Sequence, residues 1–148
     1  MNALAIFSSA WLSKLSSIFR TTYYVRAAGN AGESVTEGVT NIPFIEIEDT
    51  GNVFNGSQII MPFNGIVDVT IKTDLTPAGG NYSPVVYIDG QPEAVLDMFA
   101  PTSSSKGGNY KRKLNQGQII SFRFFNIGTQ NVVNDVLEHW LTATITRL

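Results

Sequence analysis

Apolar and polar side chains alternate along most of the chain from residue 42 to the C-terminus. The clearest run is 66–73, where Val, Val and Ile at positions 67, 69 and 71 alternate with Asp, Thr and Lys. Successive side chains of a β-strand point to opposite faces of its sheet, so this pattern predicts a strand with one buried face. No helical period interrupts the alternation in this part of the chain.

Short runs of this kind recur between turn signals. The strongest signal is Asp89-Gly90, a pair typical of tight hairpins, and 49–52 reads as a turn as well. The pattern predicts about eight strands, at residues 44–48, 58–61, 66–73, 85–88, 94–99, 110–114, 118–127 and 137–148. Strands at this spacing, with no helices between them, are typical of an antiparallel sandwich or barrel, so we expect an all-β head over residues 42–148.

The first 21 residues follow a different pattern. At 100° per residue, large apolar side chains within 3–20 share one face, opposite serines and Arg20. This predicts an amphipathic anchoring helix over 1–21, followed by an extended arm over 22–41 that is rich in Gly, Ser and Thr. The side chains predicted to dock on a partner are Leu4, Phe7, Trp11, Leu12, Leu15, Ile18 and Phe19.

Such a short aromatic helix is not stable alone in water and needs a partner. Three partners fit the sequence. The face could lie in a groove of another protein, and this is the interpretation we favour. It could instead bundle with copies of itself, or lie on a membrane surface with the help of Trp11, Lys14 and Arg20.

Composition supports an all-β head and narrows its chemistry. Only 15% of the 148 residues are charged, against about 25% in a typical soluble domain. The net charge of −2 argues against a nucleic-acid binder, and the lack of cysteine excludes disulfides and thiolate metal sites.

Candidate catalytic groups are sparse. His139 is the only histidine, and neither a phosphate-binding loop nor a nucleophile elbow is present. Glu46 and Glu48 lie two apart on a predicted strand, which is typical of a solvated face. We therefore expect no enzyme activity, no catalytic or metal-binding residues and no cofactor.

One basic cluster stands out in the predicted head. Lys111, Arg112 and Lys113 follow a Ser/Gly-rich loop, with Tyr110 beside them and Tyr82 in an earlier loop. Tyrosine rings and cationic groups are suited to stacking on and hydrogen bonding to a surface glycan. A solvated edge strand whose lysines prevent aggregation explains the same charges more simply.

The order of motifs in residues 54–148 resembles the jelly roll of the tumour-necrosis-factor and complement-globular-head family. A strand–Gly–strand element matches 61–67, a valine-rich strand leading to a hairpin matches 85–90, and a Leu-x-x-Gly-Gln-x-Ile turn matches 114–120. The closing strand matches 140–148. The likeness covers about two-thirds of the chain. It implies a homotrimer around a threefold axis, and similar heads occur on phage and other viral surface proteins.

These observations predict a structural or interaction protein of a viral particle, most readily of a phage. In this hypothesis a trimeric β-head is attached to a capsid or other virion protein through the N-terminal helix, as a decoration protein, head fibre or receptor-binding protein. The alternative is a lectin-like module for cell-surface glycans. The expected location is the virion surface, or a secreted or cell-surface position for the alternative.

Overall fold

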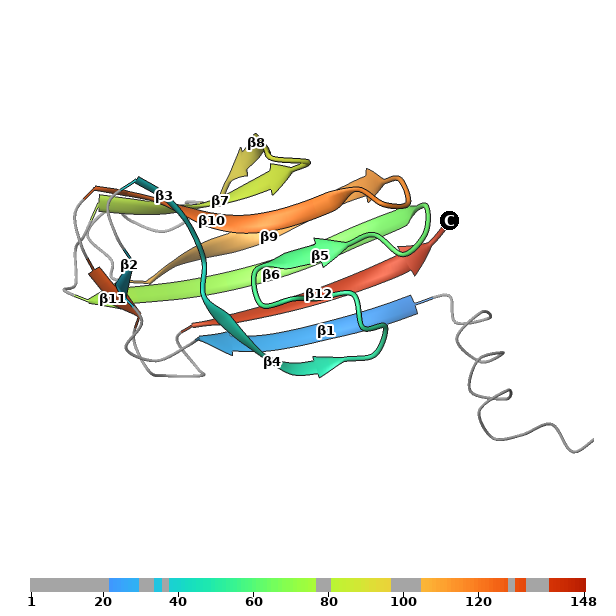
Figure 1. The fold of residues 1–148 in the computed structure, drawn as a ribbon, viewed down its shortest axis with the longest axis horizontal. Coiled ribbons are helices and arrows are strands. Elements are labelled where there is room, and N and C mark those ends of the chain that lie inside the picture. Colours follow the sequence, from blue (N-terminus) through green and yellow to red (C-terminus); the bar gives the residue numbers. More distant parts are fainter. Residues whose placement is uncertain are drawn as a thin grey trace, which may run out of the picture.

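The computed structural model describes residues 22–29, 34–35, 38–76, 81–96, 105–127, 130–132 and 139–148. All regular elements in these ranges are strands, which form two antiparallel sheets packed face to face (Figure 1). The strands are β1 (Thr22–Gly29), β2 (Ser34–Val35), β3 (Gly38–Asn41), β4 (Phe44–Asp49), β5 (Gln58–Ile60), β6 (Gly65–Thr76), β7 (Asn81–Ile88), β8 (Gln91–Val95), β9 (Ser105–Leu114), β10 (Ile119–Ile127), β11 (Gln130–Val132) and β12 (Trp140–Arg147).

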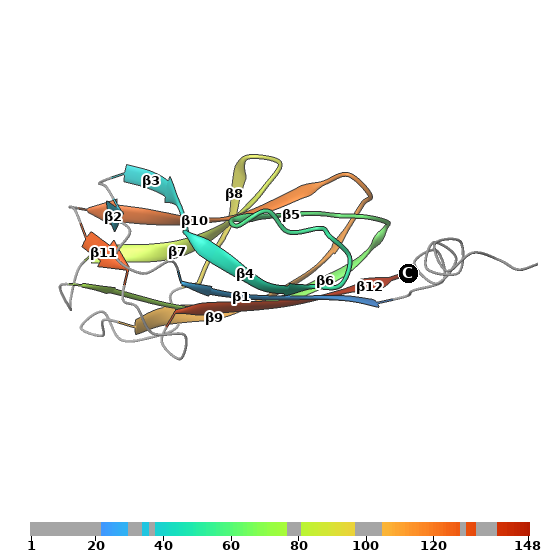
Figure 2. The same cartoon turned by 60° about the horizontal axis from the view of Figure 1, so that its bottom comes forward.

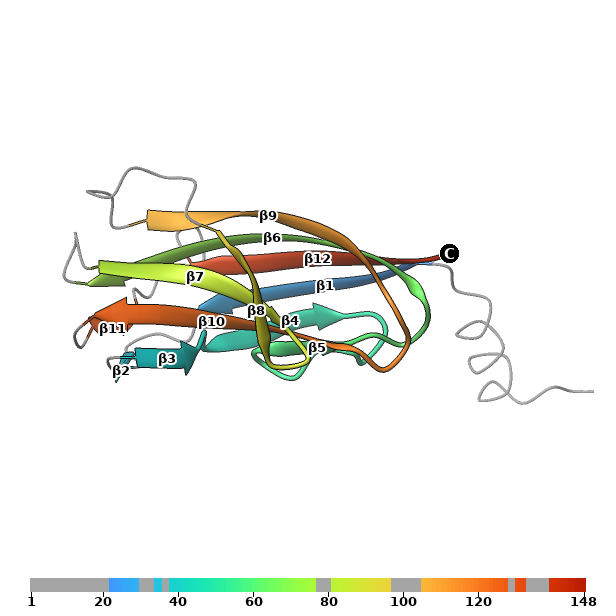
Figure 3. The ribbon, with the colours of Figure 1, turned by 90° about the horizontal axis from the view of Figure 1, so that it is seen from above.

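The first sheet has five main strands in the order β9-β6-β12-β1-β4, and β2 and β11 extend it at one end. The second sheet runs β3-β10-β7-β8, with β5 pairing to β10. Figure 2 shows the two layers nearly edge-on, and Figure 3 shows β7 and β10 crossing above the first sheet. The predicted all-β sandwich is therefore confirmed.

The core lies between the inner faces of the two sheets. The first sheet contributes alternate residues of β6 and β12, which the sequence alternation places on one side, and the second contributes alternate residues of β10. Nine of these side chains are at most 2% exposed: Val67, Val69, Ile71, Leu141, Ala143, Ile145, Ile120, Phe122 and Phe124. Their burial provides the main stabilisation of the fold.

The predicted arm over 22–41 is wrong for most of its described residues. Residues 22–29 form β1, which lies in the first sheet between β12 and β4, with Thr22 opposite Thr146. Residues 38–41 form β3, an edge of the second sheet. The head therefore begins no later than residue 22. The sequence obscured β1 because two of its buried residues, Ala27 and Ala28, are too small to give a strong apolar signal.

Two further features of the strands differ from the prediction. The described residues contain twelve strands rather than about eight, because β1, β2, β3 and β11 were not predicted. Part of the predicted Ser/Gly loop, residues 105–109, belongs to β9. The amphipathic helix over 1–21 lies outside the described residues. No helix in the described part of the chain is long and apolar enough to cross a membrane.

Both predicted turns are present, and each is held by an aspartate. At the end of β7, Asp89 and Gly90 take positive φ angles of 49° and 80°, as a tight hairpin requires. The Asp89 carboxylate accepts hydrogen bonds from the backbone N–H of Ile119 at 2.9 Å and from the Gln118 side chain at 2.8 Å. These bonds hold the pKa of Asp89 below its usual value and tie the hairpin to β10.

The second aspartate, Asp49, organises the turn after β4. Its carboxylate accepts three backbone hydrogen bonds, from Gly51 at 3.0 Å, Val53 at 2.5 Å and Phe54 at 2.7 Å. These donors would otherwise lie unpaired beside the buried side chains of Val53 and Phe54.

We expect Asp49→Ala to lower the free energy of unfolding by about 2 kcal/mol, because hydrogen bonds to a charged acceptor are lost in a partly buried turn. Asp49→Asn keeps an acceptor oxygen and should lose less. Urea unfolding of the two variants beside the parent chain measures the difference. Equal stability of Asp49→Ala and the parent would contradict this role.

Candidate functional site

The most distinctive surface of the described residues is the outside of the first sheet, called here the outer face. It is formed by the side chains of β9, β6, β12, β1 and β4 that alternate with the core residues. The outer face comprises Asn109, Lys111, Lys113, Ile66, Asp68, Thr70, Lys72, Trp140, Thr142, Thr144, Thr146, Tyr24, Arg26, Ala28, Ile45 and Ile47.

The middle of the outer face is uncharged. Thr142, Thr144 and Thr146 point outward from β12, which is flanked by Tyr24 of β1 and Ile66 of β6. At the β4 edge, Ile45 and Ile47 are 52% and 51% exposed. An uncharged threonine stripe on a sheet surface that also exposes isoleucines is typical of a surface that another protein covers.

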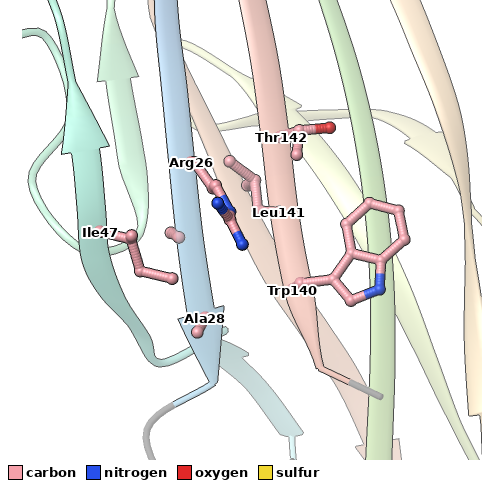
Figure 4. A pocket seen from close by; sticks show the side chains of 7 residues that line it. Arg26, Ala28, Ile47, Trp140, Leu141 and Thr142 are labelled. Atoms are coloured by element: carbon pink, nitrogen blue, oxygen red, sulfur yellow. The ribbon is translucent and has the colours of Figure 1, made fainter. Parts of the chain in front are cut away.

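Two shallow pockets mark this face. The first, of about 290 Å³, lies between β4, β1 and β12, where Arg26 projects among Ile47, Ala28 and Trp140 (Figure 4). The second, of about 420 Å³, lies over β12 and β6 and is lined by threonines, Ile66 and the pair Asp68 and Lys111. Both are broad enough to receive side chains of a partner.

Charged groups flank the threonine stripe on both sides, with Asp68 opposite Thr144 and Arg26 opposite Thr142. Lys111 forms an ion pair with Asp68 at 2.9 Å, and both side chains are substantially exposed. Such an exposed pair adds little to stability. Within the described residues, Arg26 and Lys113 form no ion pair, and neither does Glu48, which lies opposite Arg26 on β4.

The predicted glycan contacts are not brought together. Tyr82 is 2% and Tyr110 8% exposed, so neither ring can stack on a surface sugar. The Tyr82 hydroxyl donates to the carbonyl of Thr73 at 3.2 Å, and its ring packs edge-on against Phe124. Burial raises the pKa of Tyr110. These two residues are core residues, which corrects their assignment as ligand contacts.

The basic cluster is divided between two surfaces. Lys111 and Lys113 lie on the outer face, whereas Arg112 points the other way, toward the second sheet, and forms an ion pair with Glu93 of β8. This pair links β9 of the first sheet to β8 of the second. Toward the other end of β9, the buried Lys106 side chain donates to the carbonyl of Tyr82 at 2.7 Å. Neighbouring residues of β9 therefore point to different surfaces, which a count of local charges does not show.

The second sheet also exposes apolar side chains on its outer side. Val39, Phe125 and Val95 are 48%, 52% and 62% exposed, and Val39 and Phe125 are cross-strand neighbours. Arg123 lies over the Tyr87 ring at 4.5 Å between them and β8. This patch is a second candidate contact surface and serves as a comparison for the tests below.

Histidine and carboxylate side chains lie apart in the described residues. No three His, Asp or Glu residues in the described ranges come close enough to hold a metal ion. His139 is fully buried between Phe44 and Phe124, away from any surface substrate. The predicted docking side chains of the helix, from Leu4 to Phe19, lie outside the described residues and stay a prediction.

No protein-family model matches this chain, and no curated protein gives a significant sequence match. Solved structures do match its fold. Murine APRIL at pH 8.0 aligns with a TM-score of 0.64 and 15% identity, over 84% of this chain and 98% of that one. The globular domain of zebrafish complement 1qA aligns at 0.58 with 12% identity, over 86% and 96%.

A third match, Eiger TNF from S. frugiperda, has a TM-score of 0.55 and 10% identity, over 87% of this chain and 94% of that one. The chain thus has a jelly roll like those of tumour-necrosis-factor proteins and complement globular heads, as its motif order indicated. At these identities the likeness concerns the fold.

Proposed function

We propose that this protein is the oligomeric β-head of a larger assembly, in which the outer faces of three copies pack around a common axis. The observation that carries this proposal is the outer face itself, with its uncharged threonine stripe, two shallow pockets and exposed isoleucines. The jelly-roll resemblance of residues 54–148 supports three copies, because it implies a homotrimer.

We further propose that residues 1–21 attach this head to its assembly, most readily a phage or other viral particle, at whose surface the head lies. The apolar face from Leu4 to Phe19 supports this part, because a short amphipathic helix needs a partner to be stable. In the described structure, β1 begins directly after this segment, beside the C-terminal strand β12. The segment therefore joins the head where β1 begins, at one end of the first sheet.

The packing of outer faces is tested by placing a charge in the centre of the outer face. Thr144→Arg puts a long side chain in the threonine stripe, where it would clash with a packed copy, so we expect single chains in solution. Val95→Arg, on the outer side of the second sheet, is the matched control and should leave the oligomer intact. Light scattering gives both masses. Dissociation by Val95→Arg but not by Thr144→Arg would assign the contact to the other sheet.

Attachment is tested by removing residues 1–21. We expect the shortened head to fold but no longer to enter the particle. Co-sedimentation with particles assembled in its presence measures this. Unchanged incorporation would contradict an anchoring role for the segment. Arg20→Ala, outside the apolar face, serves as the control that should still be incorporated.

The glycan-binding alternative is left with Lys111 and Lys113 as surface groups, since both tyrosines are buried and Arg112 is paired with Glu93. Neither of the rings predicted to stack on a sugar is available beside these lysines. The outer face therefore supports protein packing better than glycan recognition.

A further inference from the structure

The outer side of the second sheet carries a second surface, called here the arginine patch, which is formed by Val39, Tyr87, Val95, Arg123 and Phe125. Figure 3 looks onto this side of the molecule, where β3, β10, β7 and β8 lie next to one another. The two valines and the phenylalanine are between 48% and 62% exposed. Val39 lies opposite Phe125 on the neighbouring strand, so these side chains form one surface rather than isolated exposures.

Arg123 lies in the middle of the arginine patch. It alternates along β10 with the core residues Phe122 and Phe124, so its side chain points outward. Its guanidinium lies over the Tyr87 ring, 4.5 Å from the ring centre, and the residue is partly buried. Stacking on an aromatic ring holds this planar group in a fixed orientation.

This guanidinium has no acceptor in the described part of the chain. It forms neither a hydrogen bond nor an ion pair there, and its Nε atom is buried without a partner. The residues opposite Arg123 on the neighbouring strands are Asn41 and Val85, neither of which is acidic. Arginine has five N–H donors, and partly buried donors that lack an acceptor cost free energy. A carboxylate from outside the chain would satisfy them.

The register places apolar side chains on two sides of this charge. Phe125 is two residues along β10 from Arg123, which is about 7 Å in a strand, and Val39 lies beside it. On the other side, Val95 is two strands across from Arg123, beyond Val85, which is about 10 Å. A ligand for this surface therefore needs a carboxylate between two apolar groups. Residues 1–21 do not meet this need, because they contain no acidic residue.

We propose that the arginine patch binds an extended segment of a partner protein in which a carboxylate stands between two apolar side chains. The carboxylate accepts hydrogen bonds from the Arg123 guanidinium, and the apolar side chains cover the exposed residues on either side of it. The arginine patch and the outer face lie on opposite sides of the sandwich, so copies that pack through their outer faces leave the arginine patch open. This contact is therefore separate from the proposed packing of copies.

The probe is a synthetic peptide of sequence Leu-Ser-Glu-Ser-Leu with blocked ends, beside the same peptide with Gln in place of Glu. In an extended peptide the two leucines and the central residue lie on one face, about 7 Å apart. Amide chemical shifts of the full chain are followed during titration with each peptide. We expect the Glu peptide to shift amides of β3, β10, β7 and β8, and to bind about fivefold more tightly than the Gln peptide.

Three variants of the full chain sharpen this test. Arg123→Gln should bind the two peptides equally, because the charged donor is gone. Phe125→Ser should weaken both peptides alike, because it removes apolar contact area. Arg147→Gln is the matched control and should leave both affinities unchanged, since Arg147 also lies 4.5 Å over a ring, that of Phe63, but on β12 of the first sheet. Melting temperatures show whether each variant is folded.

Equal affinities of the parent chain for the two peptides, or no binding of the Glu peptide at millimolar concentration, would overturn the proposal. The same shifts on adding a synthetic peptide of residues 1–21 would assign the arginine patch to the chain's own N-terminal segment instead. Shifts there that change with protein concentration alone would assign it to a second copy. The first two results leave the packing of outer faces untouched, because that packing is measured separately by light scattering.

Discussion

The free energy of unfolding is expected to fall by about 3 kcal/mol as the pH drops from 6.5 to 4, because His139 is buried in its neutral form. Its ring is fully buried between Phe44 and Phe124, and neither ring nitrogen makes a hydrogen bond of good geometry within the described residues. Burial lowers the pKa of His139 from 6.5 to about 4, and the backbone of Asp74 opposes this shift only in part.

The direction follows from proton uptake. Above pH 6.5 the ring is neutral in both the folded and the unfolded chain, so the ring does not change the free energy of unfolding there. Between pH 6.5 and about 4 the unfolded chain binds a proton that the folded chain does not, and stability is lost as the pH falls. Below about pH 4 the folded chain binds the proton as well and the loss levels off.

Two measurements check this expectation. His139 is the only histidine, so its ring resonances in a tag-free chain report its pKa without ambiguity, and they should titrate near pH 4. The free energy of unfolding of His139→Leu, measured with urea, should change less between pH 6.5 and 4.5 than that of the parent. A ring that titrates near 6.5 would contradict the buried, unpaired environment.

The second large effect is expected at Gly107, in β9. A Cβ atom added there would lie 2.0 Å from the carbonyl oxygen of Ile71 and 2.9 Å from Cα of Lys72, both backbone atoms of β6. Backbone in a paired strand cannot turn aside as a side chain would. We expect Gly107→Ala to lower the free energy of unfolding by about 3 kcal/mol, at the upper end of overpacking costs.

Asn109→Ala is the control for this variant, since Asn109 is exposed on the same strand. It should change stability by less than about 0.5 kcal/mol. Thermal unfolding of the two variants and the parent measures the contrast. A Gly107→Ala chain as stable as Asn109→Ala would show that β9 and β6 lie further apart than the structure has them.

The parts of the fold that the sequence predicted are those set by local chemistry. The hairpin at Asp89-Gly90 was predictable because two successive positive φ angles require such residues. Strand β6 was predictable because one of its sides is buried along its whole middle. The order of these motifs along the chain also indicated the jelly roll.

What the sequence did not predict depends on tertiary pairing. Strand β1 carries small buried residues, and its place between β12 and β4 comes from strand order rather than from its own pattern. Tyr110 was interpreted as a surface residue because a basic cluster follows it. Its even-numbered spacing from the core residue Leu114 was the available signal that it points inward.

The outer face could not be predicted for the same reason. It brings together side chains from Tyr24 in β1 to Thr146 in β12, and only the strand order β9-β6-β12-β1-β4 makes them neighbours.

The central claim, that outer faces of this head pack together, is tested most directly by the mass of the unmodified chain in solution. Light scattering at micromolar concentration should give three times the 16.1 kDa of one chain, with a shift toward single chains on dilution. A mass of one chain across the whole concentration range would contradict the claim.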